Sequence, residues 1–452
     1  MIVSLGNVLP ISFNNTTSIV KNENKIFFPV LPYKLLASYV SILVGRYNEL
    51  FGSGGSIAPK EREEREPPKV IQSIKIYIEN SASNQGYFSG ATDAKGVIGG
   101  LLSYLGHKYK DKTSLYFISG QVILYNKPVN DFINEMTLNT VASTEGNGLE
   151  SMLDSIASAL DTGVVAFFIS DCILSYSNDA ISKNREINKQ EASTKLKYGI
   201  TNVFRNLKDK GYAASIFAFK SSFNGKYWNY QNGSFDLANA VRPYYIWAIG
   251  DRELLSQLNN EIVDNVSSFR YKEELNFGFS ADIISDFEVL PSVERVGRWS
   301  KKSGVIGGVK DGDQICLLLD LKPLPSYARI PGYLEDNLEL ETKGAEVEVS
   351  FKEKADLDIS KMKSDVQKNI FEKSSHALLL KINELRTSKG EVRIRLPLKK
   401  EDWYKEWSCM NDLPISECEE RTFAFEYLIE GVKEAYTDKD VYFIDFTVQL
   451  NK

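Results

Sequence analysis

Five oxygen-bearing residues in this chain stand where they could share one metal ion. They are Glu79, Ser81, Ser83, Thr144 and Asp171. The first three follow an apolar stretch at 74–78, and the aspartate follows another at 164–169. Carboxylates and hydroxyls are oxygen ligands, which suit hard divalent cations such as Mg²⁺. A cation held largely by neutral hydroxyls keeps excess positive charge, so it could accept a further carboxylate from another molecule.

The same residues also have purely structural interpretations. The two carboxylates could be loop charges exposed to solvent or could cap turns, where Asp and Ser are common. The two serines could cap the helix that follows them. Thr140 and Ser143 are alternatives to Thr144, because the length of that loop cannot be deduced from the sequence.

Composition narrows the chemistry that this chain can perform. The 452 residues include two histidines, four cysteines and no CxxC pair, which disfavours histidine-based catalysis and zinc binding. A net charge of -6 gives no basic excess for nucleic acid. The patterns GxxxxGK[ST] and GxSxG are absent, so a P-loop ATPase or a serine hydrolase with a nucleophile elbow is disfavoured. Cys409 and Cys418 could bridge a local loop or remain free thiols.

The elements that must position the five residues alternate between strand and helix. Strands are predicted at 74–78, 115–118, 164–169, 213–219 and 244–249, with a less certain strand at 121–125. Stripes of apolar residues at helical spacing predict helices over 94–105, 149–160, 192–207 and 254–262. This alternation predicts an α/β fold with a doubly wound, mostly parallel sheet, in which ligands bind beyond the carboxyl ends of the strands.

Over residues 70–265 the chain resembles the von Willebrand factor A (vWA) family. That family carries a metal-ion-dependent adhesion site (MIDAS) with an Asp-x-Ser-x-Ser loop, a threonine before a later helix and an aspartate after a buried strand. Here Ser81, Ser83, Thr144 and Asp171 match, while Glu79 stands in place of the first aspartate. Cys172 follows the late aspartate, where the family often has glycine. The resemblance implies a vWA/Rossmann-like fold and a divalent cation that recruits protein partners.

The remaining chain divides into three further segments. Residues 270–452 combine β-rich stretches with Gly and Pro, which predicts a mainly β, sandwich-like C-terminal domain, with one helix near 423–435. Residues 52–69 have the composition of a linker, and their GSGGS sequence resembles an engineered join. Residues 1–51 are therefore either a fused segment or a segment whose helix at 33–50 packs on the main body. The apolar run at 26–44 is interrupted by prolines, so a membrane span is disfavoured.

These features together predict a protein-interaction module or an assembly subunit. It would bind Mg²⁺ or another divalent cation, and an Asp or Glu of a protein partner would complete the metal shell. One alternative is a metal-dependent hydrolase that uses the same carboxylates, and another is a scaffold subunit with a degenerate metal site. Neither nucleic acid nor a membrane is an expected partner. Few cysteines and no clear export signal favour the cytoplasm.

Overall fold

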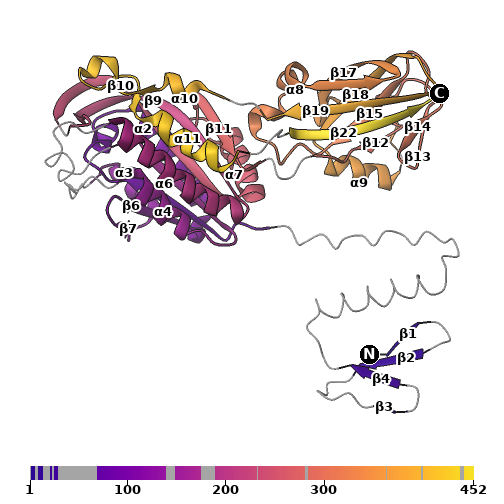
Figure 1. Ribbon diagram of the computed structural model, residues 1–452, viewed down its shortest axis with the longest axis horizontal. Helices are drawn as coiled ribbons and strands as arrows, with labels where there is room; N and C mark the ends of the chain where they lie inside the picture. The colour runs from indigo at the N-terminus through magenta and orange to yellow at the C-terminus, as the bar shows by residue number, and fades with distance from the viewer. Residues whose placement is uncertain are drawn as a thin grey trace. The chain divides into compact units, whose positions relative to one another are not determined.

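The computed structural model describes most of the chain beyond the linker (Figure 1). Beyond residue 68, the described residues are 69–138, 148–174, 189–231, 233–279, 284–362, 364–398, 401–437 and 442–452. Residues 1–68 form a separate unit, in which four strands are assigned: β1 (Ile2–Leu5), β2 (Leu9–Phe13), β3 (Lys21–Asn22) and β4 (Lys25–Phe28). The expected helix at 33–50 and the linker at 52–68 lie outside the described residues.

The first half of the described chain is built on a seven-stranded sheet with the order β11-β9-β10-β8-β5-β6-β7. Its strands are β5 (Ser73–Glu79), β6 (Thr113–Ile118), β7 (Val122–Leu124), β8 (Val164–Ser170), β9 (Tyr212–Trp228), β10 (Ser234–Asp251) and β11 (Glu273–Phe277). Strand β8 is buried along its whole length, which confirms the prediction of a strand covered on both faces.

Two sets of helices provide that cover. The helices of this part are α2 (Asp93–Lys108), α3 (Val129–Glu135), α4 (Leu149–Ser158), α6 (Lys189–Asp209) and α7 (Arg252–Asn265), with 3-10 turns η2 (Asn84–Phe88) and η3 (Lys110–Lys112). Alternate residues of β8 point to opposite faces. Phe167 joins the apolar cluster of α2, α3 and α7, and Phe168 joins that of α4 and α6. The result is a three-layer α/β arrangement.

The sheet is mixed, so the prediction of a mostly parallel sheet was wrong. Strand β5 pairs in parallel with β6 and β8, whereas the pairs β10–β8, β10–β9, β11–β9 and β6–β7 are antiparallel. The cause is the segment 220–243, which the sequence left unassigned between two predicted strands. This segment lengthens the two predicted strands into β9 and β10, which form one long hairpin. Strands joined by a hairpin must run antiparallel.

The C-terminal part is rich in β-structure, as expected. One sheet has the order β12-β15-β18-β17 and the other β13-β14-β22-β19-β16. Their strands are β12 (Glu288–Val289), β13 (Ser300–Lys302), β14 (Val305–Gly307), β15 (Gln314–Leu319), β16 (Glu339–Lys343), β17 (Ala345–Glu353), β18 (His376–Leu385), β19 (Lys389–Pro397) and β22 (Tyr442–Asn451). Between them lie η5 (Ser326–Arg329), α8 (Pro331–Asn337), η6 (Lys354–Asp356) and α9 (Asp365–Lys373). Leu317 of one sheet and Ile394 of the other belong to the same buried cluster.

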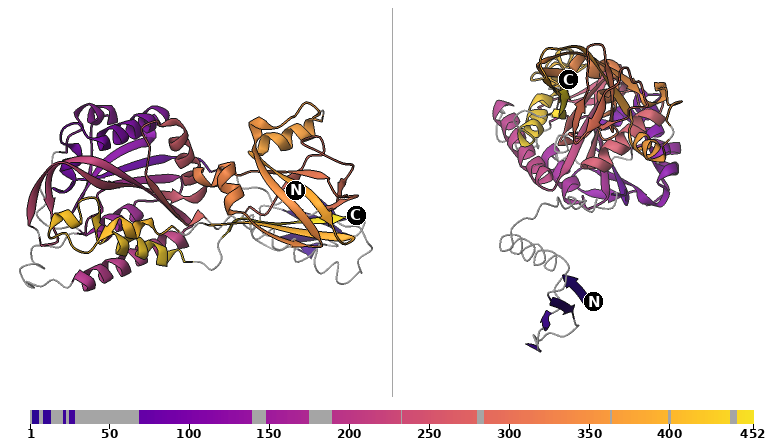
Figure 2. Two further views of the ribbon diagram at one scale, coloured as in Figure 1. Left: turned by 90° about the horizontal axis from the view of Figure 1, so that it is seen from above. Right: turned by 90° about the vertical axis from the view of Figure 1, so that its right-hand side faces the viewer.

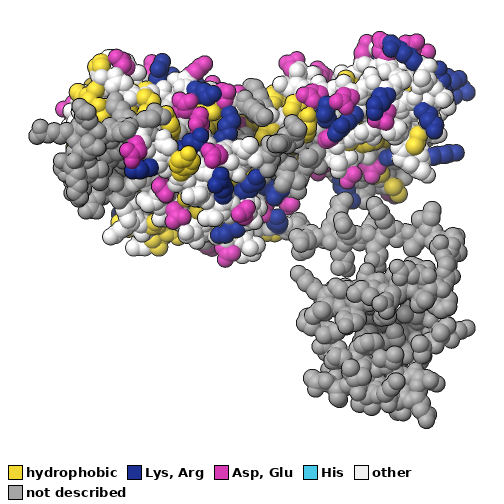
Figure 3. All heavy atoms as spheres, in the orientation of Figure 1, with side chains coloured by type: hydrophobic (Ala, Val, Ile, Leu, Met, Phe, Trp, Pro, Cys, Tyr) yellow, Lys and Arg dark blue, Asp and Glu magenta, His cyan; other side chains and the backbone are white. Residues whose placement is uncertain are grey.

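Charged residues of both signs lie side by side on the outside of these sheets. On the five-stranded sheet, Arg393 pairs with Asp445 at 2.8 Å, and Arg395 pairs with Glu341 at 2.6 Å. Lys, Arg, Asp and Glu side chains are likewise intermixed over the described face drawn in Figure 3. This face shows no extended patch of a single sign. The net charge of -6 likewise gives no basic excess.

Two pieces of the range 270–452 pack on the α/β sheet instead of the β-rich part. One is β11, which pairs with β9. The other is the segment 401–437, which we call the return segment; it contains α10 (Trp403–Glu406), β20 (Ser408–Cys409), η7 (Ile415–Glu417), β21 (Thr422–Phe423) and α11 (Phe425–Ala435). Helix α11 packs along α6, as two views show, because its apolar side completes the cluster on that face (Figures 1 and 2). None of the helices in the described part of the chain is long and apolar enough to cross a bilayer.

Candidate metal site at the strand ends

The structure brings four of the five predicted residues to one edge of the sheet. Glu79 is the last residue of β5, and Asp171 comes directly after β8. These two strands are adjacent and parallel, with Ile78 opposite Ile169, so their carboxyl ends lie together. Thr144 and its alternatives Thr140 and Ser143 lie outside the described residues.

Glu79 is held in place by the strand that lies beside it. Its side chain is 6% exposed, and Oε2 accepts a hydrogen bond from the Ser170 hydroxyl. The backbone carbonyl of Glu79 accepts a hydrogen bond of 2.8 Å from the Asn84 amide, which folds the loop back onto the strand end. A carboxylate with this exposure is not a solvated loop charge.

The two serines of the loop face each other. Ser81 Oγ and Ser83 Oγ lie 2.9 Å apart, and both residues are partly exposed. Ser83 occupies the position before η2 and makes no capping hydrogen bond there, and Thr92 precedes α2. The capping interpretation therefore does not explain these hydroxyls.

Asp171 is the most enclosed member of the set, with 1% of its surface exposed. Its Oδ1 accepts the backbone N–H of Ile173 at 3.2 Å, which is the turn contact that the structural interpretation predicted. Its Oδ2 is buried without a hydrogen bond of ordinary geometry among the described residues. The turn thus uses one oxygen and leaves the other available.

Burial makes both carboxylates hard to ionise. The pKa of Glu79 rises to about 8, because of burial first and the charge of Asp171 second; hydrogen bonds from Ser170 and Ser81 oppose the rise. Burial also raises the pKa of Asp171, against the opposing effects of the Ile173 N–H, the Ser83 hydroxyl and Arg242. Two carboxylates whose ionisation is opposed by burial form a site that a cation would stabilise.

Arg242 is a neighbour of this site that the sequence did not reveal. Strand β10 runs antiparallel to β8, with Tyr245 opposite Ser170, so the residues before Tyr245 pass the end of β8. Arg242 is 1% exposed and stacks on the Tyr227 ring, with 4.3 Å between its guanidinium carbon and the ring centroid.

The return segment covers the same strand end. Arg242 donates hydrogen bonds to the backbone carbonyls of Cys418, Glu419 and Arg421 at 3.3, 2.9 and 3.3 Å. Thr422 Oγ1 donates to the backbone carbonyl of Asp171 at 3.4 Å, and the Leu174 N–H donates to the Phe423 carbonyl at the same distance. The Asp171 loop is therefore fixed from both sides.

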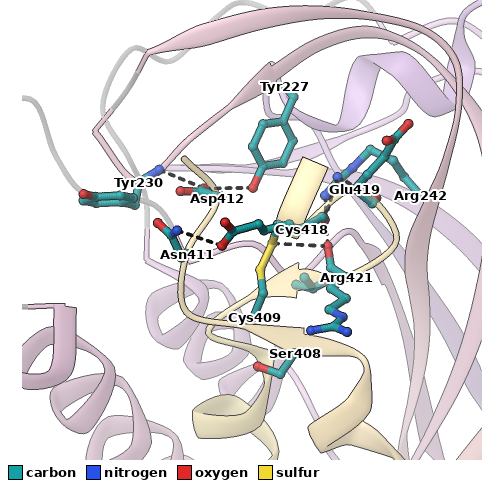
Figure 4. The surroundings of a disulfide bond; sticks show 12 residues. Tyr227, Tyr230, Arg242, Ser408, Cys409, Asn411, Asp412, Cys418, Glu419 and Arg421 are labelled. Carbon is teal, nitrogen blue, oxygen red and sulfur yellow. Dashed lines mark hydrogen bonds between the residues drawn. A yellow bond between two sulfur atoms is a disulfide. The ribbon is translucent and has the colours of Figure 1, made fainter. Parts of the chain in front are cut away.

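A disulfide closes this part of the return segment. Cys409 and Cys418 are bonded, whereas Cys172 and Cys316 are free and buried. Within the closed loop, Asp412 accepts hydrogen bonds from the Tyr227 hydroxyl at 2.9 Å and the Tyr230 N–H at 3.0 Å (Figure 4). Strand β9 thus holds the loop at one point and Arg242 holds it at another.

Cys172, which follows Asp171, adopts an unusual backbone conformation. Its φ is +56°, in the left-handed region that side chains other than glycine rarely adopt. The thiol accepts a hydrogen bond from the Trp247 indole at 3.3 Å, and the Cys172 N–H donates to Ser170 Oγ at 2.8 Å. The loop keeps this geometry without a glycine.

Within the described ranges, no group of three or more His, Cys, Asp and Glu side chains is arranged to hold a metal. The candidate site differs from such groups, since two of its four described members are serine hydroxyls. No protein-family model, no curated protein and no solved structure matches the chain.

Proposed function

We propose that this chain is a protein-interaction subunit that binds a divalent cation, with Mg²⁺ as the expected ion, at a vWA-like site. Glu79, Ser81, Ser83 and Asp171 would supply ligands, and Thr144 would supply a fifth. An Asp or Glu of a partner protein would complete the metal shell. The observation that carries the proposal is the convergence of two buried carboxylates and two facing hydroxyls at adjacent strand ends.

The chemistry of the ligand set supports recruitment. Two carboxylates and a few neutral oxygens do not fill the shell of a divalent ion, so coordination positions stay open for other oxygens. Mg²⁺ prefers six oxygen ligands and usually keeps several waters. A carboxylate from a partner could replace one of these waters. The site lacks a histidine to act as a general base, which favours binding over hydrolysis.

Glu79 is the departure from the family pattern that bears most on this proposal. Its longer side chain is already engaged by Ser170, which orients one carboxylate oxygen. That hydrogen bond fixes the extra methylene in a single direction. A fixed glutamate is able to serve as a ligand either directly or through a metal-bound water.

Mn²⁺ is a direct probe of this proposal, because its electron paramagnetic resonance signal reports free and bound ion and its bound waters report open coordination. Wild-type protein is expected to bind one Mn²⁺ ion that Asp171→Ala no longer binds. Asp154→Ala, an exposed carboxylate on α4, is the matched control and should bind as wild type does. Acetate added to the Mn²⁺ complex should lower its water-proton relaxivity by replacing a bound water.

Equal Mn²⁺ binding by wild type and Asp171→Ala would contradict the metal site. Binding that is lost on mutation but accompanied by no acetate effect would contradict recruitment of a carboxylate. The first outcome leaves the scaffold alternative, in which these residues serve only the loop structure.

A further inference from the structure

The outer edge of the seven-stranded sheet carries apolar side chains that face solvent. Strand β7 is the last strand at this edge, and among the described residues no strand pairs with its outer side (Figure 1). Val122, Ile123 and Leu124 are 44%, 51% and 46% exposed. The other large apolar residues that are exposed in the described chain stand singly in the sequence. Single exposed apolar residues are ordinary on a protein surface, whereas a contiguous run indicates a contact site.

The backbone of β7 presents hydrogen-bonding groups at the same edge. The Tyr125 N–H donates to the Leu115 carbonyl of β6 at 2.9 Å. In an antiparallel pair, residues that exchange hydrogen bonds alternate with residues that do not, so Ile123 is the next residue of β7 that bonds to β6. Val122 and Leu124 therefore direct their N–H and C=O groups away from β6, toward the open edge.

This edge lacks the features that usually discourage further pairing. Edge strands commonly carry a lysine, a proline or a bulge. The stretch 119–126 has no charged residue and no proline, and its pairing with β6 is regular. By contrast, β11 at the other edge of the same sheet carries Glu273 and Glu274. The Trp403 indole covers that edge and donates to the Glu274 carbonyl at 3.2 Å. The two edges of one sheet thus differ, and β7 is the edge open to pairing.

We propose that β7 pairs antiparallel with β7 of a second copy of this chain, so that one sheet continues through both copies. A two-fold axis at Ile123 would place Val122 of each copy opposite Leu124 of the other. The outward N–H and C=O groups of each such pair would then exchange two hydrogen bonds. Ile123 would lie beside its own counterpart at the axis, where opposite side chains come closest.

The composition of β7 favours an identical strand as the partner. A charged residue near the axis would meet a like charge of the second copy, and the stretch 119–126 contains none. The register centred on Ile123 also sets each exposed residue of β7 against an apolar one. An axis at Leu124 would instead set Val122 opposite the polar Asn126. A strand of this length buries less than the roughly 1,200 Å² of a stable interface, so the dimer should be weak and should dissociate on dilution.

Sedimentation equilibrium of the full chain tests this pairing over concentrations from about 1 μM to about 1 mM, the range of weak association. EDTA is present throughout, so the result does not depend on metal at the strand-end site. Wild-type protein should show a monomer–dimer equilibrium. Val122→Lys should weaken the dimer about tenfold, because each copy then sets a charge against Leu124 of the other. Val366→Lys, at an isolated position that is 69% exposed, is the matched control and should dimerise as wild type does. Both variants should melt within about 2 °C of wild type, since these side chains are exposed.

Two double variants test the register itself. Val122→Lys combined with Leu124→Glu would set each lysine opposite a glutamate of the other copy, which should restore the dimer to within about threefold of wild type. Val122→Lys combined with Leu124→Lys would set lysine opposite lysine and should leave a monomer over the whole range. A wild-type monomer at every concentration overturns the proposal and leaves the edge to a strand of another protein. Equal dimerisation of the two double variants also overturns it, since the register then has no effect.

Discussion

At the residue scale, the feature that decides the account is the placement of two carboxylates in a site nearly closed to solvent. Glu79 and Asp171 are 6% and 1% exposed, yet neither forms an ion pair in the described part of the chain. The charge of Arg242 acts on Asp171, while its two terminal nitrogens, Nη1 and Nη2, donate to backbone carbonyls. An arrangement of this kind is costly without a further cation.

The pH dependence of stability should reveal this cost. The pKa of Glu79 is raised to about 8 in the folded chain, so its contribution to stability is present below the ordinary value of 4.5 and is lost as pH rises toward 8. In EDTA, wild-type protein should lose stability across this window, by at most about 1.4 kcal/mol per pH unit from this group. Glu79→Gln should flatten that dependence, as measured by denaturant unfolding at pH 5, 6.5 and 8. Parallel curves for the two proteins would contradict the assignment.

Several of these residues could be predicted from the sequence and others could not. Four of them follow apolar runs, and the end of an apolar run can be recognised from the sequence alone: Glu79, Ser81, Ser83 and Asp171. Arg242 lies in the middle of a long strand with no local signal. Its role depends on the direction in which β10 passes β8, which is a tertiary property.

At the element scale, the return segment is the feature that local patterns missed. Periodicity predicted the helices and strands of the α/β part, because an amphipathic stripe reports the face that is buried. It cannot report which surface covers that stripe. The apolar side of α11 looks the same whether it packs on a β-sandwich or on α6. The 220–243 stretch was missed for a different reason: it is rich in polar residues and the start of β10 is largely exposed, so it shows no apolar alternation typical of a strand.

Arg242 should account for much of the attachment of the return segment. Arg242→Met keeps the volume but removes the Arg242 donor from the carbonyls of Glu419 and Arg421, and one of two donors from the Cys418 carbonyl. We expect a loss of about 2 kcal/mol in unfolding free energy, because hydrogen bonds from a buried, charged donor are lost. Limited proteolysis should at the same time cut within 409–421. Arg205→Met, on the exposed side of α6, is the control and should cost less than about 0.5 kcal/mol. A loss equally small for Arg242→Met would contradict this role.

At the scale of the whole molecule, residues 69–452 are one compact unit, although two sets of sheets compose it. The chain leaves the α/β part after β11, returns to it over 401–437, and ends in β22, which lies between β14 and β19. Each part therefore depends on a segment near the end of the sequence, which is 401–437 for the α/β part and β22 for the β-rich part. Sequence composition indicated a boundary near 270, but a composition shift cannot show that the chain crosses a boundary again.

Deletion of the N-terminal unit tests this organisation. A chain comprising residues 69–452 should melt within about 2 °C of the full-length protein, because residues 1–68 form a separate unit. A chain that ends at residue 398 should not fold, since it lacks both α11 and the strand between β14 and β19. Differential scanning calorimetry would measure both. A large loss of stability on removing residues 1–68 would contradict the division.

The central claim is that the strand-end site binds a divalent cation, and thermal unfolding with and without Mg²⁺ tests it most directly. At a Mg²⁺ concentration of about 100 times the dissociation constant, binding should stabilise wild-type protein by roughly 2.7 kcal/mol, which raises the melting temperature by several degrees. Asp171→Ala should abolish that rise, whereas Asp154→Ala should retain it. If Mg²⁺, Mn²⁺ and Ca²⁺ each leave the wild-type melting temperature unchanged, or if the rise persists in Asp171→Ala, the site is not the metal site proposed.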